Sequence, residues 1–173
     1  MFISREINED LSERMWETYH GEHLPRMKFL IPNKTFWKHL KDIKESNNIM
    51  MFIDCGTGNG HIPKEAISKH KIKMAGCDVV KREDHELGQI QILPAHRMPM
   101  NKEVWPMACR PDHSGWVRGL LEKAMEEGSG FIYTGLRENM ALDLGRYMLI
   151  PHIKYTDVGE DGEEMLVFPP QSL

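Results

Sequence analysis

The feature that most constrains the fold is an apolar run that ends in an acidic residue and a glycine-rich loop. Residues 49–54 read Ile-Met-Met-Phe-Ile-Asp, and residues 55–60 read Cys-Gly-Thr-Gly-Asn-Gly. An apolar run of this length without polar alternation is typical of a parallel strand covered on both faces. Alternate glycines permit a tight turn against which a ligand can press, and Pro63 suits the first turn of a helix. The sequence therefore predicts a strand, a ligand-binding turn and a helix, in that order.

Strand and helix patterns continue to alternate towards the C-terminus. A second short strand is expected at 73–80, and it carries Asp78 near its C-terminal end. Further strands are expected at 89–93, 104–109, 131–136, 152–158 and 164–168, with one helix capped by Ser114 and another over 138–148. Asp161-Gly162 predicts a hairpin turn between the last two strands. We therefore expect an α/β fold in three layers, built on a doubly wound, mostly parallel seven-stranded sheet with an antiparallel C-terminal hairpin strand.

Composition places the chain among ordinary folded proteins. Apolar residues make up 40% of the sequence and charged residues 28%, and the net charge is -4. This balance argues against coating a nucleic acid or a membrane surface by charge alone, so a nucleic-acid partner is possible but not favoured. No apolar run has membrane-spanning length and no N-terminal targeting pattern is visible, so a cytoplasmic location is expected. The 3 cysteines are expected to be reduced thiols.

The spacing of the glycines helps to identify the ligand. A dinucleotide-binding turn needs Gly-x-Gly-x-x-Gly, whereas this loop reads Gly-x-Gly-x-Gly and places His61 at the last position of that pattern. An acid that opens the loop, the alternate glycines and Asp78 at the end of the next strand resemble the Rossmann-like, class I S-adenosylmethionine-dependent methyltransferases. The expected terminal hairpin is also similar to theirs. The resemblance covers roughly residues 48–168 and implies transfer of a methyl group to an unidentified acceptor.

The resemblance implies cofactor-binding roles for several positions. Asp54 would hold the methionine end of S-adenosylmethionine, directly or through water. The loop beneath it would be formed by Gly56, Gly58 and Gly60. Asp78 matches the acid that accepts hydrogen bonds from the two ribose hydroxyls, and a carboxylate can accept two donors at once.

Two positions depart from the family pattern. Residues 94–96 read Pro-Ala-His where the family often has an acid facing the adenine amine, which leaves His96 as the candidate contact. Residues 110–113 read Arg-Pro-Asp-His where amino-methylating members carry Asp-Pro-Pro-Tyr or Asn-Pro-Pro-Tyr. Methylation of an amide or a base amino group is therefore not supported. Asp112 and His113 are the expected catalytic residues, because either could orient a nucleophile or take its proton. A solvated helix cap is the alternative for this pair.

We expect a single methyltransferase-like domain over 1–173, with a helical N-terminal segment at 1–48 and a Rossmann-like core at 49–173. Helices are expected at 4–20 and directly after Asn33, packed over the cofactor side. Two other functions stay open. The chain could be a catalytically inactive binding module that keeps the fold and the cofactor site, or an enzyme that uses the same cofactor for other chemistry.

Some remaining residues carry a weaker functional signal. Cysteines near the strand ends, with His96 and His113, would suit zinc, but no closely spaced pair of ligands supports a site and no metal is expected. Trp116 could stack on a planar substrate or join the core. The basic stretch from Arg26 to Lys44 could touch a phosphate backbone, although a solvated helix face is the favoured interpretation.

Overall fold

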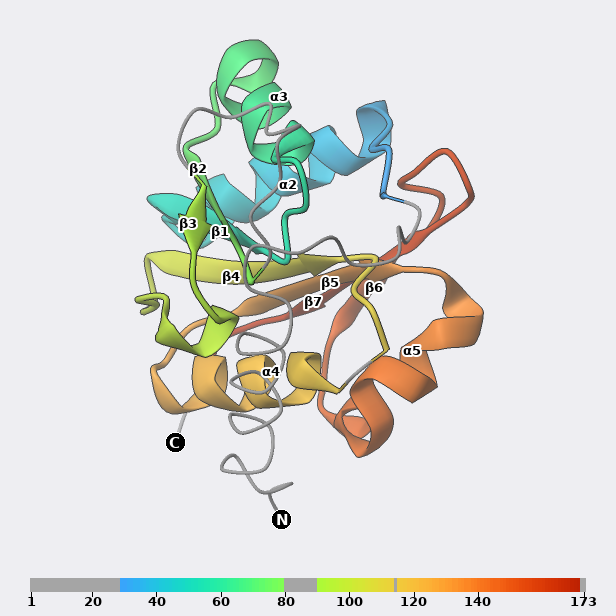
Figure 1. Cartoon of the computed structure of the whole chain (residues 1–173). Helices are drawn as coiled ribbons and strands as arrows, with labels where there is room; N and C mark the ends of the chain where they lie inside the picture. Colours follow the sequence, from blue (N-terminus) through green and yellow to red (C-terminus); the bar gives the residue numbers. More distant parts are fainter. Residues whose placement is uncertain (1–28, 80–89, 114, 172–173) are drawn as a thin grey trace.

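The computed structural model describes residues 29–79, 90–113 and 115–171. Within these residues the chain forms a seven-stranded sheet in the order β3-β2-β1-β4-β5-β7-β6 (Figure 1). The strands are β1 (Met51–Cys55), β2 (Met74–Asp78), β3 (Gln91–Ile92), β4 (Val104–Cys109), β5 (Phe131–Gly135), β6 (Ile153–Tyr155) and β7 (Glu164–Phe168). The strands β1 to β5 pair in parallel, whereas β7 runs antiparallel to both β5 and β6. The predicted sheet and its reversed C-terminal strand are confirmed.

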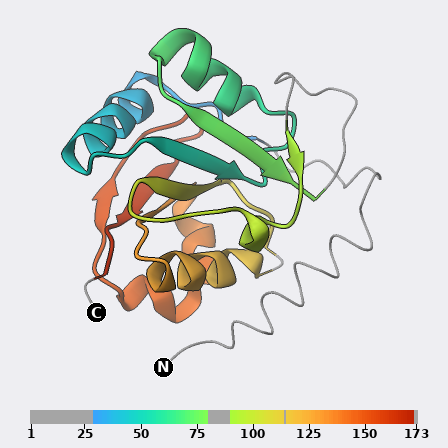
Figure 2. The same ribbon diagram turned by 90° about the vertical axis from the view of Figure 1, so that its left-hand side faces the viewer.

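Helices cover both faces of this sheet. The α-helices are α2 (Lys34–Ser46), α3 (His61–His70), α4 (Trp116–Glu126) and α5 (Arg137–Leu144), and short 3-10 helices are η1 (Ala95–Arg97) and η2 (Gly145–Leu149). Figures 1 and 2 show α2 and α3 on one face and α4 and α5 on the other. This is the predicted three-layer, doubly wound arrangement. The helix predicted at 4–20 lies outside the described residues.

Two hydrophobic clusters fill the spaces between the layers. Phe52 of β1 joins the cluster under α2 and α3, while its neighbour Ile53 joins the cluster over α4 and α5. Successive side chains of a strand point to opposite faces, so a strand with helices on both sides needs apolar residues at every position. The continuous apolar run in the sequence has this physical origin.

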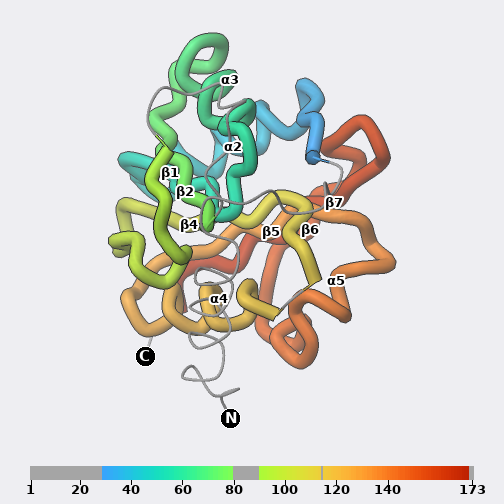
Figure 3. The backbone as a smooth tube through the Cα atoms, viewed as in Figure 1, coloured from blue at the N-terminus to red at the C-terminus, as the bar shows by residue number. Residues whose placement is uncertain are grey.

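The helix α2 begins where the sequence predicts it. Asn33 accepts a hydrogen bond from the backbone N–H of Phe36 at 3.1 Å and so caps the helix. The N–H of Asn33 also donates to the carbonyl of Val158 at 3.0 Å, which fastens the start of α2 to the β6–β7 hairpin. Figure 3 shows these two segments side by side. Helix α2 packs on a face of the sheet, and the residues just ahead of it reach the glycine loop.

Several predicted boundaries are wrong. The N-cap position of helix α4 is Gly115, which has a left-handed backbone with φ 97°. The predicted cap, Ser114, lies outside the described residues. A glycine suits this turn because it has no Cβ to clash. Gly145, with φ 55°, ends α5 at Leu144, and the predicted continuation to Met148 is a 3-10 turn. Strands β3 and β6 are shorter than predicted because each lies at an edge of the sheet and pairs with a single neighbour.

Within the described part of the chain, no helix combines the length and the apolar character needed to cross a membrane.

Candidate functional site

The predicted turn between β1 and α3 lies at the carboxyl ends of the central strands. Gly56, Gly58 and Gly60 have φ values of 71°, 65° and 81°, so all three have a left-handed backbone that favours glycine. The N–H groups of Gly56 and Thr57 both donate to the carbonyl of Cys77 at 2.9 Å, which ties the loop to β2. The alternate glycines are therefore required by the path of the backbone itself.

Asp54 is the least satisfied polar residue of this loop. Asp54 is only 1% exposed to solvent, and the Thr57 hydroxyl donates a hydrogen bond to its Oδ2 atom at 2.7 Å. Its Oδ1 atom is buried and has no hydrogen-bond partner among the described residues. Burial raises the pKa of Asp54, the hydrogen bond from Thr57 lowers it, the charge of Asp78 raises it and Cys109 lowers it. The net result is a rise of this pKa from 3.8 to about 7. The site thus holds a carboxylate with an unused acceptor atom.

Asp78 lies across the loop from Asp54. It ends β2, it is half-buried, and its Oδ2 atom accepts a hydrogen bond from the N–H of Gly58 at 2.7 Å. The strands β1 and β2 are adjacent and parallel, so their carboxyl ends meet at one edge of the sheet. The structure therefore brings Asp54, the three glycines and Asp78 together, as the resemblance implies. The roles of these residues towards a cofactor are taken up below as a proposal.

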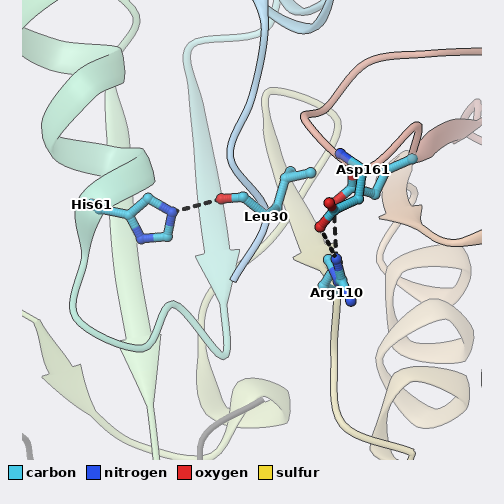
Figure 4. A network of polar contacts seen from close by, with 5 residues as sticks. Leu30, His61, Arg110 and Asp161 are labelled. Atoms are coloured by element: carbon cyan, nitrogen blue, oxygen red, sulfur yellow. Dashed lines mark hydrogen bonds and ion pairs between the residues drawn. The ribbon is translucent and has the colours of Figure 1, made fainter. Parts of the chain in front are cut away.

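The residues ahead of α2 are fastened to the glycine loop. A Cβ atom at Gly58 would lie 2.4 Å from Cε1 of Phe29, so the ring of Phe29 packs directly on this glycine. Nε2 of His61 lies 2.7 Å from the carbonyl oxygen of Leu30, as Figure 4 shows, and Nδ1 lies 2.9 Å from Oδ1 of Asn59. Nothing in the sequence pattern indicates these contacts, because Phe29 and Leu30 are about 30 residues from the loop.

A second aromatic ring connects the glycine loop with the loop after β4. A Cβ atom at Gly56 would lie 3.1 Å from Cζ2 of Trp116, so the indole covers this glycine. The indole Nε1–H donates to Oδ1 of Asp112 at 3.2 Å. Trp116 is buried, and it belongs both to the core and to the site. The Trp116 side chain therefore contacts both Asp112 and the glycine loop, and links the two.

His113 makes its own polar contacts next to Asp112. Its Nδ1 atom lies 2.6 Å from Oδ1 of Asp143 in α5, and the Tyr133 hydroxyl of β5 donates to Oδ2 of Asp143 at 2.5 Å. Asp143 is 2% exposed, whereas the His113 side chain is 30% exposed. Burial, and then the hydrogen bond to Asp143, raise the pKa of Tyr133 well above its ordinary value of 10.0. Sequence reasoning singled out His113 but missed Asp143 and Tyr133.

Arg110 holds the loop after β4 against the β6–β7 hairpin. Its backbone has φ 45°, and its Nη1 atom donates to Asp161 at 2.9 Å and to Glu163 at 3.2 Å, a contact drawn in Figure 4. Glu163 is fully buried. One guanidinium is thus paired with two acids of the hairpin, the exposed Asp161 and the buried Glu163. This pairing anchors the segment that carries Asp112 and His113.

The remaining predicted site residue, His96, lies in η1 beyond β3. Its carbonyl oxygen accepts a hydrogen bond from Nζ of Lys123 in α4. This position is at the same edge of the sheet as the glycine loop, since β3 is parallel to β2. A contact of His96 with the adenine of a cofactor stays a prediction. Among the described residues, no group of three or more His, Cys, Asp or Glu side chains is placed to hold a metal ion.

Comparison with known proteins identifies the fold. No model of a known protein family matches the sequence, and no curated protein matches it. A candidate RNA methyltransferase from Pyrococcus horikoshii matches with 12% identity and a TM-score of 0.56, over 99% of this chain and 100% of the other. An RNA methyltransferase from Salinibacter ruber in complex with S-adenosylhomocysteine matches with 13% identity and a TM-score of 0.54, over 87% and 96%.

A small-molecule enzyme shares the same architecture. The 1,6-didemethyltoxoflavin-N1-methyltransferase of Burkholderia thailandensis, with its substrate and S-adenosylhomocysteine bound, matches with 8% identity and a TM-score of 0.54, over 99% of this chain and 92% of the other. At these identities the likeness establishes the fold. The chain has the Rossmann-like fold of the class I S-adenosylmethionine-dependent methyltransferases, as the glycine loop and its two acids predict.

Proposed function

We propose that this protein binds S-adenosylmethionine at the loop between β1 and α3 and transfers its methyl group to an acceptor near the loop after β4. The observation that carries the proposal is the buried carboxylate of Asp54, whose Oδ1 atom has no hydrogen-bond partner among the described residues. Burying such an atom costs free energy unless a ligand supplies the missing donor. An ammonium group, such as that of the cofactor's methionine end, supplies both a donor and the opposite charge.

The other proposed cofactor contacts lie around Asp54. Asp78 is half-buried at the loop, and a carboxylate that already accepts the N–H of Gly58 has further lone pairs for ribose hydroxyls. The backbone of Gly56, Gly58 and Gly60 forms the turn between the two acids. His96 is proposed to face the adenine from η1. S-adenosylmethionine would supply an electrophilic methyl group on a sulfonium centre.

The catalytic roles are proposed for the loop after β4. Asp112 accepts a hydrogen bond from the indole of Trp116, so it fixes the ring that packs on Gly56. His113 is more exposed and contacts the buried carboxylate of Asp143. Of the two predicted residues, His113 therefore suits proton removal, and Asp112 suits the positioning of the loop. Two of the similar structures contain S-adenosylhomocysteine, which agrees with a cofactor site in this fold.

Calorimetric titration with S-adenosylmethionine and S-adenosylhomocysteine tests the cofactor site. We expect both to bind the full chain, and Asp78→Asn to weaken binding by roughly tenfold or more because charged hydrogen bonds are lost. Asp157→Asn is the matched control, since this exposed residue has a left-handed backbone that asparagine tolerates. No heat from either compound with the wild-type chain would contradict the proposal.

A binding module without catalysis is the second candidate. It is favoured by the rings of Phe29 and Trp116, which pack on two glycines of the loop and narrow the space above it. Incubation with methyl-labelled S-adenosylmethionine separates the two functions. An enzyme labels an acceptor, and a binding module shows affinity for the cofactor without any labelled product.

A further inference from the structure

The helices α2 and α3 share one surface of the molecule. Figures 1 and 2 show both on the same face of the sheet, and the ring of Trp37 in α2 stacks on that of His70 in α3 with centroids 4.3 Å apart. The apolar side chains of both helices belong to the same hydrophobic cluster. The residues of α2 and α3 that remain exposed therefore lie on a common surface.

This common surface is rich in lysine. The segment 34–73, which contains both helices, has 8 lysines and 4 acidic residues, although the whole chain has a net charge of -4. One of the acids, Asp54, is buried in β1. We call the lysines of this segment the lysine face; all are exposed except the half-buried Lys44, and the others are Lys34, Lys38, Lys41, Lys64, Lys69, Lys71 and Lys73.

The lysine face is not neutralised by its neighbours. Among the described residues, none of its lysines has an ion-pair partner. Asp42 and Glu45 are exposed four residues after Lys38 and Lys41, and even they form no pair with these lysines. A solvated helix face, which the sequence pattern favours, commonly carries pairs at this spacing. The ammonium groups thus remain available to an anionic partner.

The cations on the opposite face of the sheet are bound within the protein. Arg118 donates to two backbone carbonyls at the end of α5, and Lys123 donates to two at η1. Arg137 pairs with Glu164 at 2.8 Å. In the part of the chain that the structure describes, Arg146 is the one cation of the segment 116–149 without such a contact. Unpaired positive charge is therefore concentrated over α2 and α3.

The lysine face begins next to the candidate site. Helix α3 starts at His61, directly after the glycine loop, and Nε2 of His61 lies 2.7 Å from the carbonyl oxygen of Leu30, just ahead of α2. Lys34 and Lys64 are thus in the first turns of two helices whose starts meet at the loop. The lysines further along each helix extend the face away from that edge of the sheet.

We propose that the lysine face binds the phosphate backbone of a nucleic-acid strand beside the candidate site. This goes beyond the proposed function, which names no partner. Lysine attracts phosphate as a point charge and does not read the base, so it suits backbone binding. From Lys34 to Lys44 the helix rises about 15 Å, a length over which a strand presents several phosphates.

The surroundings of the lysines favour this partner over two alternatives. Phe36 and Trp37 alternate with the lysines in the sequence, but they are 0% and 3% exposed and pack in the core, so they are not available to stack on bases. We therefore expect a weak dependence on base sequence. An amphipathic helix binds a membrane surface by burying its apolar face in the lipid, and the apolar face of α2 is already used inside the protein.

Fluorescence anisotropy of the full chain with a labelled, mixed-sequence single-stranded RNA tests the surface. We expect affinity to fall with salt, with a slope of log affinity against log salt of about -3, because each neutralised phosphate contributes about 0.7 and roughly four are contacted. Combined Lys34→Gln, Lys38→Gln and Lys41→Gln should weaken binding by roughly tenfold or more and reduce the slope by about 2. The same three positions changed to arginine should keep wild-type binding, because the charge is retained.

A pair of single charge reversals on opposite faces is the matched control. Lys38→Glu and Arg146→Glu alter the net charge equally, and both residues are exposed. We expect Lys38→Glu to weaken RNA binding at least threefold more than Arg146→Glu. Equal losses would overturn the proposal, since they would show a response to net charge alone. The absence of RNA binding by the wild-type chain, or binding that the combined glutamine variant leaves unchanged, would overturn it as well.

DNA of the same sequence and vesicles of phosphatidylserine and phosphatidylcholine are measured in parallel. Lysine-dependent binding to RNA or DNA supports the proposal, whereas lysine-dependent binding to vesicles without binding to either strand overturns it. Titration with S-adenosylhomocysteine on the same samples keeps the two proposals apart. RNA binding without S-adenosylhomocysteine binding counts only against the proposed function, and the reverse result counts only against the lysine face.

Discussion

Asp54 and Asp143 are two buried aspartates with opposite surroundings. They are 1% and 2% exposed, respectively, and each accepts one hydroxyl hydrogen bond, from Thr57 and from Tyr133. The second oxygen of Asp143 contacts Nδ1 of His113, whereas the second oxygen of Asp54 has no partner among the described residues. Equal burial therefore does not imply an equal role.

The difference follows from the cost of burying charge. A buried carboxylate is unfavourable unless donors or positive groups compensate it. Asp143 receives that compensation from the protein, so it can hold another side chain in position. Asp54 receives only part of it, and its pKa is raised to about 7 as a result. A ligand that donates a hydrogen bond to the unpartnered oxygen of Asp54 would remove this unfavourable burial, and the free energy released would strengthen binding.

The largest expected effect is on cofactor affinity. We predict that Asp54→Asn weakens the binding of S-adenosylhomocysteine by a hundredfold or more, roughly 3 kcal/mol, because a charged hydrogen bond in a buried site is lost. Asp143→Asn should change the same affinity by less than about threefold, since it contacts His113 and Tyr133. Calorimetric titration of both variants checks this contrast. Equal losses would show that the two aspartates act on one site.

A smaller effect is expected on stability as a function of pH. The pKa of Asp54 is about 7 in the folded state and near 3.8 in the unfolded chain, so between these values the folded state binds more protons. The free energy of unfolding must then fall as pH rises through this window, and level off above about 7. Asp54→Asn removes this dependence. Between pH 5.5 and pH 8 we predict that the variant gains roughly 2 kcal/mol relative to wild type.

Chemical denaturation at the two pH values measures this difference. The opposite result is a wild-type chain whose free energy of unfolding increases towards pH 8 relative to that of Asp54→Asn. It would show that the protein itself stabilises the ionised Asp54 carboxylate. The combination of higher stability with lost affinity is the particular signature expected of a binding residue held under electrostatic strain.

The smallest effects are expected when the hydroxyl donors are removed. Thr57→Val and Tyr133→Phe each delete one hydrogen bond to a buried carboxylate, and each should lower the free energy of unfolding by about 1 kcal/mol. Thr57→Val should also weaken S-adenosylhomocysteine binding, whereas Tyr133→Phe should leave it unchanged. Thermal unfolding and titration of the two variants measure both quantities. An effect of Tyr133→Phe on affinity would contradict the separation of the two regions.

The fold and half of the candidate site could be predicted from local patterns. The continuous apolar run of β1, the loop at Gly56 to Gly60 and the acid Asp78 occur within one strand–helix–strand unit. Parallel pairing of neighbouring strands then brings their carboxyl ends together. Boundaries were less predictable, as the shortened β3 and β6 show, because pairing with a single neighbour depends on where the sheet ends.

The contacts across the sheet edge could not be predicted in the same way. Phe29 reaches Gly58, Asp143 reaches His113 across 30 residues, and Arg110 reaches Asp161 across 51 residues. No periodicity or spacing links such pairs, since they depend on how helices and loops pack after the sheet has formed. Trp116 is a similar case. Its sequence position suggests either a core residue or a residue that stacks on a ligand, and in the structure it is buried in the core and also packs on Gly56 of the glycine loop.

By itself the sequence determined the three-layer sheet and the loop with its two acids, because hydrophobic periodicity and the left-handed backbone of glycine act over a few residues. Only the tertiary structure decided which aspartate is left unsatisfied and which holds a histidine. That distinction depends on the donors that packing brings to each buried oxygen, and these come from distant parts of the chain.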